Sequence, residues 1–226
     1  MKKGIKFGLK KDIVVCHTRH EGSMDPVKAV IHLEKECEEK GIEIVKGCHV
    51  RQIMDDDNPV HLKTTLGTFS ATRVALCTNA LSRDLYPGLD VRPAKNQVYV
   101  TSRIRHSLIG TYHMDKGFVY FRPVGDRVLI GGGRHLHRKN EEGVSFDHRI
   151  EDFLKETLGS YLETDDEIRF EYKWIGHIGI GQSKEPLVSS NLNGVIHGVR
   201  LSGMGVALAP VLAKKIVNLI LDNLDA

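Results

Sequence analysis

The sequence has few cysteines, almost no excess charge and no long apolar run. Its four cysteines, Cys16, Cys37, Cys48 and Cys77, form no CxxC pair, and no segment reads as a secretory leader, so we expect a reduced, cytoplasmic chain. Because 32 basic residues nearly balance 29 acidic ones, a polybasic nucleic-acid-binding arm and an acidic tail are excluded. No window approaches the roughly 18 apolar residues of a membrane span.

Several catalytic and nucleotide-binding motifs are also absent. The sequence contains no Walker motif and no GxSxG motif. The histidine pairs His17/His20 and His135/His137 belong to no Cys pattern and have no partner carboxylate at a spacing that would complete a metal site, so we expect no metal. A metal-dependent hydrolase that used these histidines therefore has little support.

The composition, with 41% hydrophobic and 27% charged residues, is that of an ordinary globular protein, and its periodicities predict a mixed α/β fold. Asp25 as N-cap and Pro26 as first helical residue predict a helix to about residue 40. Apolar alternation and turn residues predict the other elements. These are strands at 42–45, 49–54, 60–65 and 69–78, and antiparallel strands at 91–104, 117–123, 126–133 and 170–180. A helix is predicted at 148–162, with Gly159 as a candidate terminator, and another at 206–224, preceded by a strand.

Two glycine clusters are candidates for close approach of the backbone to a ligand. Gly203-Met204-Gly205 lies between a predicted strand and a helix whose N-terminus presents free N–H groups, although a plain tight turn explains it equally well. The full GxGxxG pattern is not met, because the third position is Leu208. In the Gly131-Gly132-Gly133 run, Gly132 could approach a flat ligand, with a bulge or bend as the equal alternative.

Tyr120 and Arg122 are the candidate substrate-binding pair. Because alternate residues of a strand point the same way, both side chains are predicted on one face. A guanidinium beside a phenol can bind a substrate carboxylate, although an ordinary surface pair is at least as good an explanation.

Taken together, these segments resemble one family, the FAD-dependent oxidoreductases of the D-amino-acid-oxidase type. No single segment is specific, but seven occur in the family's order and cover almost the whole chain. They are EGSMDPVKAVIHLEKECEEKGIEI, GCHV, VALCTNA, VRPAKNQVYV, GFVYFRPVGDRVLIGGGRHL, KWIGHIGIGQSKEPLV and HGVRLSGMGVALAPVLAKKI.

The resemblance implies an incomplete FAD-binding, Rossmann-like domain interleaved with an antiparallel-sheet substrate domain. The FAD-side domain would comprise 1–90 and 190–226, and the substrate domain 91–189. The family's opening strand–GxGxxG–helix unit, of roughly 30 residues, is absent, so the chain is similar to the C-terminal part of such an enzyme.

The resemblance also implies residue roles. The backbone of Val50 would meet the adenine, and Thr78, Asn79 and Ala80 would form the turn beside the pyrophosphate. Gly203, Met204 and Gly205 would place the N-terminus of a helix at the flavin, where a positive end stabilises negative charge. Tyr120 and Arg122 would face and orient the substrate. The segment around His177, where some relatives keep a substrate-binding arginine, has none, and no cysteine near Gly181 could bind the flavin covalently, so FAD would be non-covalent.

The implied activity is oxidation of an amine or amino-acid C–N bond by hydride transfer to the flavin. A complementary N-terminal FAD-binding half is the implied partner, besides the small-molecule substrate. The alternative is an inactive remnant, or a subunit, that acts as a protein-interaction module through the surface such a half would cover.

Overall fold

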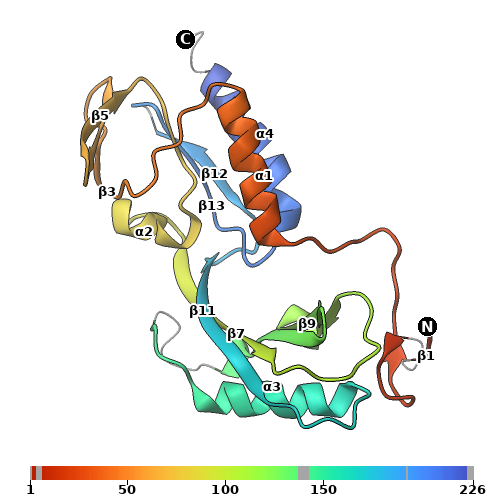
Figure 1. Cartoon of the computed structure of the whole chain (residues 1–226). Helices are drawn as coiled ribbons and strands as arrows, with labels where there is room; N and C mark the ends of the chain where they lie inside the picture. The colour runs from red at the N-terminus through yellow and green to blue at the C-terminus, as the bar shows by residue number, and fades with distance from the viewer. Residues whose placement is uncertain (1, 4–6, 137–142, 192, 223–226) are drawn as a thin grey trace. The chain divides into compact units, whose positions relative to one another are not determined.

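The computed structural model describes residues 2–3, 7–136, 143–191 and 193–222 and shows a mixed helix-and-sheet fold (Figure 1). Two compact units are interleaved along the chain. Unit 1 comprises Met1–Met24 and Lys95–His177, and unit 2 comprises Asp25–Ala94 and Ile178–Ala226. Of the three chain boundaries between them, one precedes the first long helix, and the other two fall inside long strands, β7 (Arg92–Thr101) and β11 (Phe170–Ile180).

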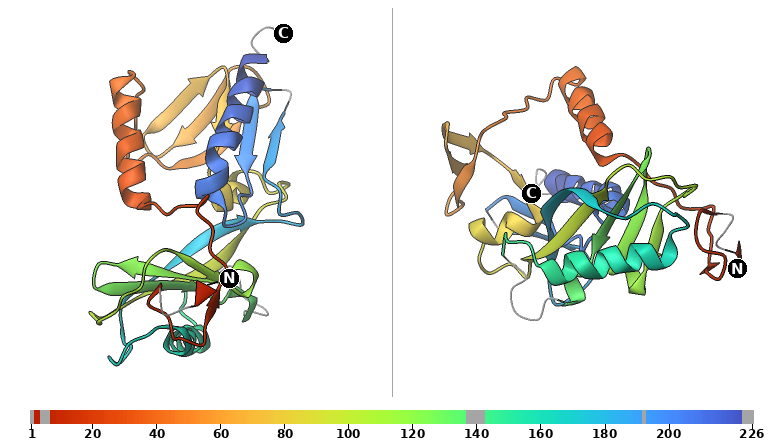
Figure 2. Two further views of the ribbon diagram at one scale, coloured as in Figure 1. Left: turned by 90° about the vertical axis from the view of Figure 1, so that its right-hand side faces the viewer. Right: turned by 60° about the horizontal axis from the view of Figure 1, so that its bottom comes forward.

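Unit 1 is a five-stranded sheet with one covering helix. The strand order is β11-β7-β10-β9-β8, where β8 is Tyr112–Met114, β9 is Val119–Val124 and β10 is Arg127–Gly132. Helix α3 (His148–Tyr161) begins at Asp147, whose side chain accepts the N–H of Arg149, and lies across one face of the sheet (Figure 2). Its Ile150, Leu154 and Leu158 share a core with Tyr99 and Phe121. Short elements complete the unit: β1 (Lys2–Lys3) paired with β2 (Val14–Val15), η3 (Asp115–Gly117) and η4 (Arg134–Leu136).

Unit 2 contains a small sheet with the order β12-β13-β6, in which β6 (Val74–Leu76) and β13 (Val195–Val199) are parallel and β12 (Leu187–Ser190) is antiparallel. Helix α4 (Gly205–Asp222) packs Leu212 and Ile216 against Ile196 of β13. The other face of β13 contributes Val195 to a core with Val60 and Leu76. The parallel pair is therefore covered on both faces, as parallel strands require.

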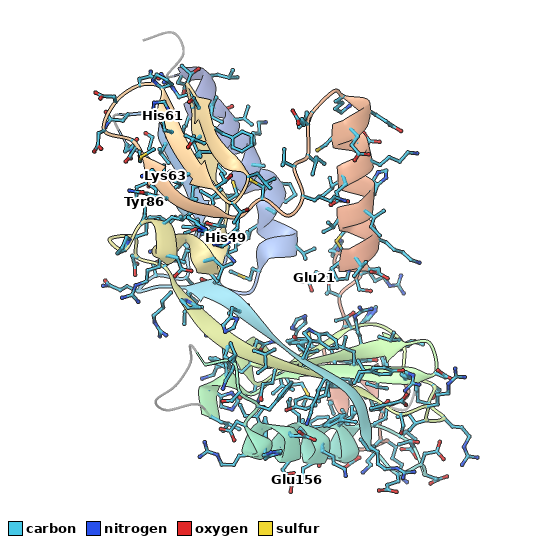
Figure 3. The ribbon with its side chains drawn as sticks, turned by 60° about the vertical axis from the view of Figure 1, so that its left-hand side comes forward. Glu21, His49, His61, Lys63, Tyr86 and Glu156 are labelled. Carbon is cyan, nitrogen blue, oxygen red and sulfur yellow. The ribbon has the colours of Figure 1, made fainter. Side chains whose placement is uncertain are left out.

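A second, antiparallel sheet of unit 2 has the order β3-β4-β5, formed by Val50–Met54, Val60–Thr64 and Gly67–Ala71. Val60 and Leu62 face the core, while His61 and Lys63 lie on the other face of β4 (Figure 3), where His61 Nδ1 is 2.8 Å from Ser70 Oγ. Three helical segments belong to the same unit: α1 (Pro26–Glu39), η2 (Asn79–Leu81) and α2 (Ser82–Leu85).

The first predicted helix is confirmed, and three other predictions are wrong. The predicted strand 69–78 is divided between β5 and β6, which belong to different sheets. Asp25 caps α1 by accepting the N–H groups of Val27 and Lys28. The segment 42–45 forms no strand, because its exposed Ile42 and Val45 have no neighbouring strand among the described residues. Gly159, expected to end the helix, lies inside α3.

The described residues before α1 belong to unit 1, whereas the predicted division of the chain groups them with the FAD side. They pack in unit 1, where Leu9 is fully buried in the core and forms a bridge with Leu162. The N–H of Lys10 also donates to the Tyr161 carbonyl (2.9 Å). The functional assignment of the two parts as FAD side and substrate side stays a prediction.

No helix within the described ranges combines the length and apolar character needed to cross a membrane.

Candidate functional site

Six of the candidate cofactor residues of unit 2 gather beyond the carboxyl ends of β6 and β13. Because these strands are parallel, their ends meet at one edge of the sheet, where ligands bind in open α/β folds. Thr78, Asn79 and Ala80 follow β6, while Gly203, Met204 and Gly205 follow β13 and lead into α4. Two segments more than 100 residues apart in sequence therefore meet at one edge of the sheet.

Asn79 joins the two turns directly. Its Oδ1 accepts hydrogen bonds from the backbone N–H groups of Arg200 (3.0 Å) and Leu201 (3.2 Å). Gly179, at the end of β11, lies against the same carboxamide, since a Cβ on Gly179 would come within 2.5 Å of Asn79 Oδ1. Next to it, Thr78 Oγ1 and the buried Ser82 Oγ are 2.7 Å apart.

The side chain of Arg200 stabilises the turn that follows β13. It is only 8% exposed, forms an ion pair with Asp90, and its Nε donates to the Glu185 carbonyl (2.9 Å). The Asp90 carboxylate also accepts the N–H of Gln182. Gly181 has room only for hydrogen, because a Cβ would lie 2.5 Å from Arg200 Cδ and from the Asp90 carbonyl.

The backbone at this edge adopts several left-handed conformations. Asn79 (φ +47°), Arg200 (φ +64°) and Ser202 (φ +52°) are three of the five non-glycine residues with positive φ in the described ranges, and Gly203 (φ +87°) continues the turn. Such conformations are costly for residues with a Cβ and concentrate at functional sites. The turn delivers the chain to Gly205, where the first N–H groups of α4 have no partner within the helix. Free N–H groups and the helix dipole together fit an anionic or electron-rich group.

Unit 1 contains the predicted substrate pair on the sheet face opposite α3. Val119 and Phe121 of β9 point into the core, so the alternate side chains Tyr120 and Arg122 share the other face, as predicted. Within the described residues, the guanidinium of the half-buried Arg122 has neither an ion pair nor a hydrogen bond. This leaves its guanidinium available to an anion.

Tyr120 is held by its neighbours. Asn96 Nδ2 donates to the Tyr120 hydroxyl (2.9 Å), and the ring lies over Gly131, whose missing side chain makes room for it. Burial raises the pKa of Tyr120, and the hydrogen bond from Asn96 opposes this rise. The phenol therefore stays protonated at neutral pH, and its own O–H remains able to donate.

The backbone conformation of the same sheet requires glycine at position 132. It has φ +125°, and a Cβ there would overlap the carbonyl of Phe118. The fold alone thus accounts for this glycine, and a role in cofactor binding stays a prediction. Val50 begins β3, in a different sheet from the other candidate residues, and its role also stays a prediction.

Sequence reasoning missed Arg200, Asp90 and Asn96. No local sequence pattern predicts that Arg200 adopts a left-handed conformation or that it forms an ion pair with Asp90, 110 positions away. Asn96 had one usable signal, since a polar residue that alternates with Val98 and Val100 on one strand face suggests a specific contact.

The other features of the described residues that could form a site are histidine and acidic clusters and one cavity. No group of three or more His, Cys, Asp or Glu residues within the described ranges could hold a metal ion, and His137 lies outside those ranges. A half-open cavity of about 670 Å³ lies in unit 1 between residues 7–23 and β8, and none of the predicted site residues lines it.

Comparison with known proteins gives consistent results. A family model described as FAD dependent oxidoreductase matches residues 7–219. The chain is 27% identical over 211 residues to a probable oxidoreductase, OrdL, of Rhizobium meliloti (strain 1021), covering 89% of this chain and 48% of that protein.

Among solved structures, glycine oxidase from Geobacillus kaustophilus matches with a TM-score of 0.73 and 19% identity over 84% of this chain and 52% of its own. L-proline dehydrogenase from P. horikoshii matches with a TM-score of 0.72 and 17% identity over 88% and 56%. The fold is therefore shared with these proteins, and the chain spans about half the length of the relatives that it matches.

Proposed function

The chain belongs to the family of FAD-dependent oxidoreductases, and we propose that it supplies the substrate-facing sheet and part of the flavin site of an enzyme that oxidises an amine or amino-acid C–N bond. The observation that carries this proposal is that Tyr120 and Arg122 lie on the same face of β9, opposite α3, and that the Arg122 side chain has no partner among the described residues. An ordinary surface arginine that is half-buried would be expected to have a carboxylate beside it.

The chain's own residues would bind and orient the substrate. Arg122 would bind the substrate carboxylate, because a guanidinium offers two parallel hydrogen bonds to its oxygens. The hydroxyl of Tyr120 already accepts from Asn96 and would therefore donate its own hydrogen to the substrate. FAD, when bound, supplies the hydride acceptor.

Residues of unit 2 would hold the flavin non-covalently. The turns at Thr78–Ala80 and Gly203–Gly205 would border the flavin, and the free N–H groups of the first turn of α4 would face its anionic or electron-rich part. The four cysteines are free, and Gly181 is enclosed by Arg200 and Asp90, which supports non-covalent rather than thioether attachment.

The complementary half would occupy unit 2. Among the described residues β6 pairs only with β13, so its other edge is open, and none of the residues of α1 is buried. The apolar residues Val27, Val30, Ile31 and Leu33 of α1 are 56–65% exposed. A segment made of a strand and a helix would cover these surfaces. An open strand edge and an exposed apolar helix face can also bind another protein when no flavin is present, so a protein-interaction module is the second candidate function.

Absorption spectroscopy tests the proposal. The chain is titrated with FAD alone and together with the N-terminal half of a relative, and amines and amino acids are then screened for bleaching of the flavin. We expect a perturbed flavin spectrum and bleaching with the added half. An unperturbed spectrum in both titrations would favour the interaction module.

A variant pair tests the substrate class. Arg122→Gln should raise KM about 10- to 100-fold for amino acids and leave amines without a carboxylate unchanged, because one charge-assisted hydrogen bond contributes about 1.5–3 kcal/mol. Arg103→Gln is the matched control, since Arg103 is an exposed arginine of unit 1 that pairs with Asp126. Equal effects of both variants on KM would contradict the assignment of Arg122.

A further inference from the structure

The cavity of unit 1 has the size of a small-molecule site. Its volume is about 670 Å³, and protein pockets that bind small molecules usually measure about 300–1,000 Å³. Strand β8, the last strand of its sheet, forms one wall, and residues 7–23 form the other. The residues assigned above to the substrate and to the flavin do not line it. The cavity is therefore open to a ligand of its own.

Aromatic side chains line both walls of the cavity. On the β8 wall, Tyr112 stacks on Phe121, with ring centroids 4.8 Å apart and an angle of 15° between the ring planes. On the other wall, the rings of Phe7 and His17 lie 5.5 Å apart. The Tyr112 hydroxyl donates its hydrogen within the protein, to the carbonyls of Phe7 and Ile109. Such rings favour an aromatic ligand, because aromatic groups pair with one another beyond simple burial.

Apolar side chains at the cavity are exposed to water. Val14 and Ile109 are 64% and 55% exposed, and both line the cavity. Beside them lie Val15 and Met114, which are half-buried and pack on the unit 1 core. A single exposed apolar residue needs no explanation, but a group of them around one hollow marks a surface that a ligand covers. The body of the ligand should therefore be apolar.

The charge at the cavity is negative. Among the described residues that line it, Glu21 alone carries a full charge at neutral pH, and the neighbouring polar residues Thr18 and Ser23 are neutral. Glu21 is exposed, and within the described part of the chain its carboxylate has neither an ion pair nor a hydrogen bond. A carboxylate beside apolar walls attracts a cation and repels an anion. The polar end of the ligand should therefore be positively charged.

We propose that this cavity binds a small aromatic amine in its protonated form. The aromatic ring would lie among the side chains of Phe7, Tyr112 and Ile109, and the ammonium group would pair with Glu21. Binding requires neither the flavin nor the pair Tyr120 and Arg122, which is not part of the lining. The site is therefore separate from the one at which oxidation of a substrate is proposed.

Three probes that share a phenyl ring test the ligand class. At neutral pH phenethylamine is a cation, phenethyl alcohol is uncharged and hydrocinnamate is an anion. Each is titrated without flavin into the chain labelled with ¹³C at its methionine methyl groups and followed by NMR. Met114 lines the cavity, whereas Met204 is an exposed methionine of unit 2. The amine should shift the Met114 signal at the lowest concentration, the alcohol at a higher one and the acid least, while the Met204 signal stays in place. A Met114→Leu variant identifies the signal.

A pair of variants tests the position of the ammonium group. Glu21→Gln should weaken binding of the amine about two- to fivefold, the range expected of an exposed ion pair, and should leave the alcohol unchanged. Glu156→Gln is the matched control, because it removes the same charge from an exposed position of α3 that does not line the cavity (Figure 3). Ile109→Ser should weaken the amine and the alcohol by similar factors, since it removes only apolar surface.

Three results would each overturn the proposal. They are a Met114 signal that the amine does not shift, an acid that shifts it as strongly as the amine, and equal effects of Glu21→Gln and Glu156→Gln on binding of the amine. Binding of the acid to Arg122 would leave the Met114 signal in place, because Arg122 lies on the opposite face of the sheet from Met114. Circular dichroism verifies the fold of each variant. Since no measurement uses flavin, failure of the proposed oxidation would leave these results unchanged.

Discussion

His197 illustrates how one buried side chain makes stability depend on pH. It is 6% exposed, its Nδ1 lies 3.3 Å from Ser189 Oγ, and its ring meets that of Tyr86 edge-on. Its Nε2 has no partner within the described chain. Burial lowers the pKa of His197 below its ordinary 6.5, against a smaller opposing effect of Asp55. The folded state therefore favours the neutral ring.

The sign of the pH dependence follows from this shift. A group whose pKa is lower in the folded state binds fewer protons there, so its contribution to stability is complete above pH 6.5 and is lost as the pH falls below it. Urea unfolding at pH 7.5 and pH 5.5 should show a fall in the free energy of unfolding that His197→Gln reduces. His32→Gln, on exposed α1, should keep the full fall. Equal falls in both variants would contradict this role of His197.

Gly131 and Gly132 are neighbours whose replacement should have different consequences. A Cβ at residue 131 would meet the hydroxyl end of Tyr120, which can rotate away, so Gly131→Ala should cost about 1 kcal/mol. A Cβ at residue 132 would overlap the backbone carbonyl of Phe118, and its φ of +125° suits only glycine. Gly132→Ala should therefore cost about 3 kcal/mol or more. Urea unfolding of both variants checks the order, and equal costs would refute this account.

At the scale of elements, α1 and α3 have the same length and opposite environments. Both are 14-residue helices, but α3 buries Ile150, Leu154 and Leu158, whereas α1 buries none of its residues. A helix of this length is marginal without packing. Hydrogen exchange should therefore be at least about tenfold faster in α1 than in α3. Exchange that is equally slow in both helices would show that α1 is packed in solution.

Local signals explain why some elements could be predicted from the sequence. Asp25 and Pro26 act within the first turn of α1, so the sequence predicts where this helix starts. Alternate residues of a strand share a face, which predicts that Tyr120 and Arg122 lie side by side. The segment 42–45 failed because a strand needs a neighbour, which apolar alternation does not reveal. The bonds from Arg200 to Asn79 and Asp90 join residues 121 and 110 positions apart, and no pattern within a window could show them.

At the scale of the whole chain, the N-terminal segment is fastened to unit 1 by side chains. Leu9 is buried in its core, and Lys10 Nζ donates to the Gly159 carbonyl (2.7 Å). Arg19 follows in an exposed stretch. Brief trypsin treatment should cut after Arg19 and leave the peptide bound, so that the nicked chain co-elutes in size-exclusion chromatography and separates only in urea. Arg19→Gln should abolish this first cut, and release of the peptide without denaturant would contradict the packing.

The parallel pairing of β6 with β13 also constrains how the protein is made. On the ribosome, Val74 emerges long before Val195, its partner in the sheet, and all of β7 to β11 is synthesised between them. Unit 1 can close its sheet as soon as β11 emerges, while the early part of unit 2 must wait with Leu76 and Val60 uncovered. Contacts this distant in sequence form slowly and leave apolar surface exposed meanwhile. Nascent unit 2 is therefore where a chaperone would be needed during synthesis.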